Sequence, residues 1–253
     1  MRKFFVYIAL SLLSFNALLA SDVETLTDSA QSYFMQTRYA DALMLYDSVS
    51  NMGYSSSDLY YNMGNCCYRL NEIPYAVYYY EKALMLDPSN EDAEFNLNIA
   101  NRSLKQSVDP LPMPFYTRWG IKILNMLSSD AWTILNIIML ALLFIGIAMY
   151  LFFSGLALRK LGFSIAVISM AVFIFTAVCA YKSSVAITEN NYAVVFEQSM
   201  VKSSPNADAV NSFEICEGLK VQVVDSANGM YNIRLADGKE GWIPMSDVKM
   251  LAE

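Results

Sequence analysis

The chain has 253 residues, of which 55% are hydrophobic and 16% are charged, whereas soluble domains carry about 25% charged residues. The sequence contains no histidine, which excludes Ser-His-Asp and Cys-His catalysis and every histidine metal site. A formal net charge of −7 argues against nucleic-acid binding, because that role requires a basic surface. No phosphate-binding Gly-x-x-x-x-Gly-Lys loop is present. We therefore expect a non-enzymatic membrane protein with no cofactor and no metal.

The first 20 residues have the layout of a secretory signal peptide. Arg2 and Lys3 precede an apolar run over 4–13, and small residues follow up to Ala20. The run is shorter than the ~20 residues that a spanning helix needs. We expect cleavage after Ala20, with an uncleaved anchor as the alternative, because Leu18 is unfavourable near a cleavage site. Either outcome exports the residues that follow.

Residues 21–106 contain an internal repeat of 34 residues. The shift aligns Ala42 with Ala76 and Tyr46 with Tyr80. This is the period of the tetratricopeptide repeat, a pair of helices. The second copy resembles that family closely and reads Tyr60-x-x-Met63-Gly64-x-x-Cys67, then Ala76-x-x-x-Tyr80, then Pro88. The resemblance implies an all-α domain of two repeats and a capping helix at about 91–106.

Such repeats bind protein partners, usually on the concave face lined by the first helix of each pair. Side chains three or four residues apart share one face of a helix. The predicted binding residues are Thr27, Gln31, Phe34, Tyr61, Asn65, Tyr68 and Arg69. Related repeats that clamp a peptide carboxylate carry a lysine at the position of Tyr61, so the resemblance does not imply such a clamp. The alternative is that these tyrosines only pack helices together.

The repeat region is short for its class. About three repeats are usually needed for a stable stack, so we expect this region to lean on the membrane or on a partner. Cys66 and Cys67 lie next to each other in one predicted helix, and no Cys-x-x-Cys spacing occurs. We interpret both as small core residues rather than redox groups.

Residues 107–130 are predicted to lead from the repeats to the membrane. Three prolines within 110–114 interrupt any helix and make a stiff, extended spacer. Tyr116, Trp119 and the apolar residues of 121–127 then predict a short helix in the membrane interface, where amphipathic aromatic side chains are favoured.

Two uncharged stretches, 131–153 and 161–180, are long enough to cross a bilayer. Their link, residues 154–160, carries two basic residues, and positive loops stay in the cytoplasm. We therefore expect a hairpin of two transmembrane helices with both polar regions outside the cytoplasm. Asn136 is the one amide in the two stretches, and we expect it to bond across the helices. Neither stretch contains a charged residue, so no ion or proton pathway is predicted.

Residues 190–253 alternate apolar and polar side chains as short strands do. The runs 219–224 and 231–235 have a period of two, and Asp237-Gly238 predicts a hairpin turn. The order of the runs, with Gly-Trp-Ile at 241–243, resembles the bacterial SH3-like domain. That resemblance implies a small all-β barrel that binds peptides or cell-wall material. The predicted groove residues are Tyr192, Phe196, Tyr231 and Trp242. For Trp242 the alternative is a packing role.

The order of these parts resembles the BatE family, membrane proteins of the Bat aerotolerance operon of anaerobic bacteria. The resemblance implies a bacterial inner-membrane location, periplasmic repeats and barrel, and a role in oxygen or stress tolerance. It implies Bat proteins with von Willebrand factor A domains as partners, and indirectly a MoxR-type ATPase. We therefore expect a scaffold that binds proteins through its repeats. The alternative is a cell-wall sensor or anchor that binds peptidoglycan through the barrel.

Overall fold

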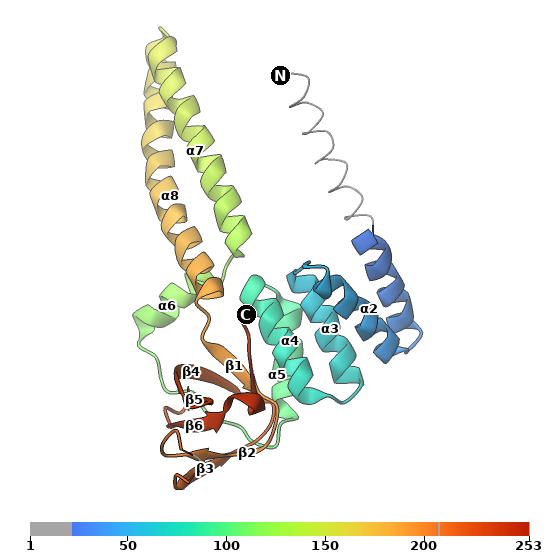
Figure 1. Cartoon of the computed structure of the whole chain (residues 1–253). Helices are drawn as coiled ribbons and strands as arrows, with labels where there is room; N and C mark the ends of the chain where they lie inside the picture. Colours follow the sequence, from blue (N-terminus) through green and yellow to red (C-terminus); the bar gives the residue numbers. More distant parts are fainter. Residues whose placement is uncertain (1–21, 207, 253) are drawn as a thin grey trace, which may run out of the picture.

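The computed structural model describes residues 22–206 and 208–252, and the predicted signal peptide, residues 1–20, lies outside them. Along the chain come a helical region, a pair of long apolar helices and an antiparallel sheet (Figure 1). The sheet lies beside the helical region, and the two long helices project away from both (Figure 1).

The helical region is built from helix pairs. The first pair is a helix over 22–35 followed by α2 (Tyr39–Asn51), the second is α3 (Ser57–Arg69) with α4 (Ile73–Leu86), and α5 (Glu91–Arg102) follows. The Ser56 hydroxyl caps α3 by accepting a hydrogen bond from the Leu59 amide at 3.1 Å, and Asn90 caps α5 in the same way. α4 ends at Leu86 because Pro88 lacks an amide hydrogen and disfavours helix in the residue before it.

α3 and α4 cross closely at Gly64. A Cβ atom on Gly64 would lie 2.6 Å from two ring carbons of Tyr80, which is closer than any real carbon contact. The Tyr80 ring is fully buried and therefore fills the space that the missing side chain leaves. The absence of a side chain at Gly64 therefore allows α3 and α4 to pack closely around the Tyr80 ring.

The spacer leads to α6 (Phe115–Leu124), and α7 (Ser129–Phe152) and α8 (Leu156–Thr188) follow. Both α7 and α8 are long and apolar enough to cross a membrane. The connection between them is shorter than the predicted 154–160, and α8 continues well past the predicted end at 180. A charged residue such as Lys182 ends an apolar stretch, but it does not end a helix.

Small residues line the contact between α7 and α8. A Cβ atom on Gly146 would lie 2.7 Å from the Ala166 backbone nitrogen, and one on Gly162 would lie 2.8 Å from the Gly146 carbonyl oxygen. Asn136 Nδ2 donates hydrogen bonds of 2.9 Å to the Phe173 carbonyl and to the hydroxyl on α8 at position 176. Backbones that approach this closely and polar groups that bond across helices are typical of helix pairs in membranes.

The C-terminal region is one antiparallel sheet with the strand order β3-β2-β6-β5-β4-β1-β7. Its strands are β1 (Tyr192–Val195), β2 (Ser199–Lys202), β3 (Asn211–Ile215), β4 (Lys220–Ala227), β5 (Met230–Arg234), β6 (Glu240–Pro244) and β7 (Val248–Met250). A 3-10 turn, η1 (Met245–Asp247), joins β6 to β7. The predicted hairpin at Asp237-Gly238 connects β5 to β6, and the left-handed backbone that it needs is taken by Gly238 at φ 88°.

Gly64→Ala should destabilise the repeats. Alanine is the better helix former, but its methyl group would push against Tyr80, whose hydroxyl is held by Asn65 at 2.8 Å. We expect a loss of about 1–3 kcal/mol, measured by denaturant unfolding of the full chain in detergent. Gly120→Ala is the matched control, because nothing lies within 4 Å of the added carbon there. Equal stability of the two variants would contradict the close crossing.

Candidate functional site

The repeats and the sheet share one apolar core. Val194 of β1 and Leu251 after β7 are fully or almost fully buried, and they pack with Tyr78 of α4. The Phe196 ring lies edge-on to two rings of α4, with centroids 4.6 Å from Tyr75 and 5.8 Å from Tyr78. Aromatic pairs in this geometry add to the free energy that burial alone supplies. The sheet therefore supports the short stack of helices.

Polar contacts flank this apolar core. Lys220 Nζ lies 2.6 Å from Glu81 Oε2, and the Glu81 side chain is only 11% exposed. On the other side, the Cys216 amide donates a hydrogen bond of 3.0 Å to Gln106. Since part-exposed ion pairs contribute little net stability, we assign most of the binding to the apolar contacts and the alignment of the two parts to the polar ones.

Two of the predicted binding residues take part in a network inside the repeats. Asn65 Oδ1 accepts hydrogen bonds from the Tyr80 hydroxyl at 2.8 Å and from Asn96 Nδ2 at 2.9 Å. The same Asn96 nitrogen lies 3.4 Å from the Tyr61 hydroxyl. Burial raises the pKa of Tyr80, so its hydroxyl stays a donor at every physiological pH. Tyr61 and Asn65 thus join α3 to α4 and α5, and they are half-buried rather than free.

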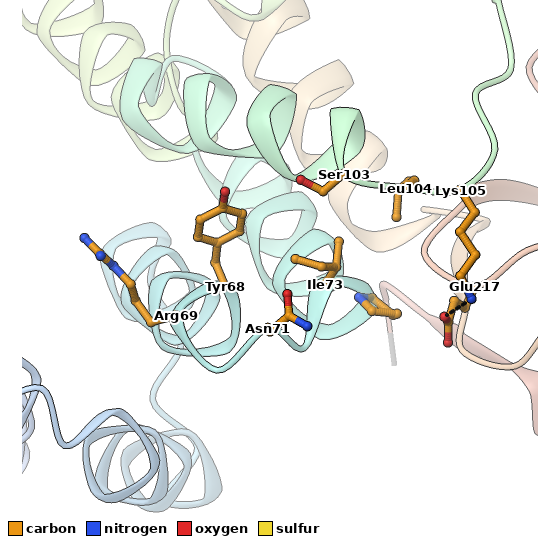
Figure 2. A pocket seen from close by; sticks show the side chains of 9 residues that line it. Tyr68, Arg69, Asn71, Ile73, Ser103, Leu104, Lys105 and Glu217 are labelled. Atoms are coloured by element: carbon orange, nitrogen blue, oxygen red, sulfur yellow. Dashed lines mark hydrogen bonds and ion pairs between the residues drawn. The ribbon is translucent and has the colours of Figure 1, made fainter.

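Tyr68 and Arg69, also predicted, lie at the edge of a cavity of about 480 Å³ at the carboxyl ends of α3 and α5. Figure 2 shows the Arg69 side chain directed outward, while Lys105 and Glu217 meet at the opposite end. The Lys105–Glu217 distance is 3.3 Å. Repeats and sheet both line this cavity, and its cations lie at its rim.

The three binding residues predicted in the first repeat differ in their contacts and in their exposure to solvent. Thr27 donates its hydroxyl hydrogen to the Val23 carbonyl at 2.8 Å. Phe34 packs against the core of the repeats and meets Tyr39 edge-on at 5.1 Å. Gln31 is exposed to solvent. Gln31 is therefore the most accessible of these three side chains.

Two apolar side chains on the first helices were not predicted. Phe95 is 65% exposed and Met35 is 78% exposed. The 34-residue shift finds both, because Phe95 follows Tyr61 by one period and Met35 precedes Arg69 by one period. Together with Gln31 and Arg69 they form what we call the first-helix face: Gln31, Met35, Arg69 and Phe95.

The four aromatic residues predicted for a barrel groove do not come together. Tyr231 pairs with Ile243 and Trp242 pairs with Asn232 across β5 and β6, and successive residues of a strand point to opposite faces. Tyr231 therefore lies on the core side of the sheet and Trp242 on the other. Phe196 is covered by α4, and Tyr192, 40% exposed, lies beneath the ammonium of a β4 lysine. The prediction of one groove is corrected accordingly.

These features define a helical-repeat protein with two apolar helices and a sheet packed against its repeats. Among the described residues, no group of three or more His, Cys, Asp or Glu side chains is placed to hold a metal ion.

The tetratricopeptide repeat model matches residues 57–90, which cover α3, α4 and the cap of α5. The prediction of a repeat at this place is confirmed, and the match indicates a role in protein–protein interaction. No curated protein matches the chain.

Phe196→Ala should release the repeats from the sheet. The variant loses the ring contacts with Tyr75 and Tyr78, which we expect to cost about 2 kcal/mol, less than the ~3–5 of a fully buried phenylalanine. Cleavage of α3–α5 by a protease at low concentration should rise roughly thirtyfold, because it follows the population of the opened state. Met200→Ala is the control, because Met200 lies on β2 and is 46% exposed, and it should leave cleavage unchanged. Unchanged cleavage in Phe196→Ala would show that the contact is weak.

The two adjacent thiols should be unreactive in the folded chain. Burial raises the pKa of Cys66 and of Cys67 to about 12, and only the thiolate reacts with maleimide. We expect slow labelling of both at neutral pH and fast labelling after unfolding. Because the thiol pKa is near 9 once unfolded, the free energy of unfolding should fall as the pH rises from about 9 toward 12. Rapid labelling of the folded chain at these positions would contradict their burial.

Proposed function

We propose that the protein is a non-enzymatic membrane scaffold that binds a protein partner on the first-helix face of its repeats. One observation carries the proposal: the sheet covers the α4 side of the matched repeat, whereas the first helices keep exposed apolar side chains. Phe95 and Met35 are large apolar side chains, and both are mostly exposed. Exposed apolar groups framed by polar ones are typical of protein-binding surfaces.

The helices of this face carry acidic residues at one end and basic residues at the other. The first turn of α5 carries Glu91, Asp92 and Glu94, and Arg102 lies in its last turn. Arg69 holds the same place in the last turn of α3. A partner segment with a basic end and an acidic end, separated by an apolar residue for Phe95, would complement this arrangement.

The membrane-spanning role of α7 and α8 belongs to the same proposal. Their length and composition suit a bilayer, and their contact is built from small residues. The first turns of α8, just after the connection, carry Arg159 and Lys160, and positive charge at this end of a hairpin favours the cytoplasmic side. With the connection between α7 and α8 in the cytoplasm, the repeats and the sheet lie on the outer side of the inner membrane. The orientation agrees with a signal peptide at the start of the chain.

The resemblance to the BatE family suggests the partners: Bat-type membrane proteins with von Willebrand factor A domains, and indirectly a MoxR-type ATPase. In this proposal the C-terminal sheet is an SH3-like barrel. Its strands run β7-β1-β4-β5-β6, with β2 and β3 as an added hairpin and a 3-10 turn before the last strand.

Cell-wall binding through the sheet is the second candidate. Trp242 favours it, because its ring lies on the face of the sheet opposite to the core. The coverage of Phe196 by α4 weakens it, because one of the four expected groove residues then holds the sheet to the repeats.

A photo-crosslinking amino acid placed at Phe95 tests the scaffold. In intact cells we expect discrete crosslinks to membrane proteins that carry von Willebrand factor A domains. The same amino acid at Met44 of α2, which is 63% exposed on a second helix, is the matched control and should give none. Equal crosslinking from both positions would contradict the assignment, and crosslinks to peptidoglycan from Trp242 alone would favour the wall-binding role.

A further inference from the structure

The helix α6 exposes its aromatic side chains. Phe115 is 77% exposed, Tyr116 67% and Trp119 70%, and none of the residues of α6 is buried. At 100° per residue these three side chains and Ile123 fall on one side of the helix. A helix of ten residues with such a face is not stable in water by itself, so something outside the described chain must cover it.

The position of α6 indicates what covers it. Trp132 Nε1, in the first turns of α7, donates a hydrogen bond of 3.1 Å to the carbonyl of Leu124 at the end of α6. Trp132 is buried against Phe175 of α8, with ring centroids 6.2 Å apart. The end of α6 is thus fixed to the start of α7. This is the level at which the apolar stretch of α7 begins.

The charges of α6 fit the same surface. Arg118 and Lys122 are four residues apart, both are exposed, and 115–124 contains no acidic residue. Aromatic rings with polar edges prefer the headgroup region, and lysine and arginine extend from such helices to lipid phosphates. Both observations point to a lipid surface rather than to a protein, because a protein partner would not need to coincide with the end of a span.

We propose that α6 lies in the plane of the membrane surface, with Phe115, Tyr116 and Trp119 inserted among the headgroups and its two cations on lipid phosphates. The proposal rests on the membrane anchoring by α7 and α8 proposed above. α6 then acts as a second anchor that sets the height of the repeats. A cavity of about 910 Å³, lined by residues of α4, α5, α6, α8 and β1, lies next to this helix.

Trp119 fluorescence tests the proposal in the full chain reconstituted in phosphatidylcholine–phosphatidylglycerol nanodiscs. We expect lipids brominated near the headgroup to quench part of the emission, and Trp119→Phe to abolish that part. Trp242→Phe is the matched control and should retain it, because Trp242 lies in the sheet. Quenching that is the same in Trp119→Phe and the wild type would overturn the proposal.

A second variant separates charge from insertion. Arg118→Ala combined with Lys122→Ala should shift the Trp119 quenching to higher phosphatidylglycerol content, while the chain stays in the membrane after carbonate washing. If the wild-type chain is released by carbonate, both the proposed anchoring and the α6 proposal fail. If it stays in the membrane but Trp119 is quenched only by aqueous acrylamide, the α6 proposal alone fails.

Discussion

The apolar contact between α4 and β1 is the interaction on which the rest of the structure depends. Two helix pairs and α5 make a short stack, because about three repeats are usually needed, and the sheet supplies a further neighbour. Val194 and Phe196 take the place that a further helix pair would occupy against α4. Because the sheet takes the α4 side, the first helices are the part of the repeats left to meet a partner.

The sheet also joins the helical repeats to the two long apolar helices. α8 ends at Thr188 and β1 begins at Tyr192, so only a short link separates the long helix from the sheet. That link is held by the Tyr192 amide, which donates to Asn190 Oδ1 at 2.9 Å, and by the Val223 amide, which donates to the Asn191 carbonyl at 2.7 Å. A short, hydrogen-bonded link therefore joins α8 to the sheet, and the sheet in turn packs against the repeats.

Local patterns in the sequence predicted the elements well. The 34-residue period and the alternation of apolar and polar residues in the C-terminal region are patterns of nearby residues. Helices and strands are found where these patterns predict them. The bounds of α8 could not be predicted from hydropathy, because a helix continues past a charged residue when nothing breaks it.

The site was predicted only in part, because it depends on contacts between distant segments. No local pattern shows that Asn65 is held by Tyr80 and Asn96, or that Phe196 is covered by α4. In contrast, the 34-residue period alone predicts Phe95 as a binding residue if Tyr61 is one, because the two occupy equivalent positions. Periodicity thus finds the candidates, and tertiary packing decides which of them remain accessible.

The central claim is that the repeats and the sheet form one cooperative unit. Native-state hydrogen exchange of the full chain in nanodiscs, followed over a series of low denaturant concentrations, tests it most directly. The account predicts that amides of α4 and of β1 open with the same free energy and the same denaturant dependence. Opening of α4 at a clearly lower free energy, with β1 still protected, would contradict it.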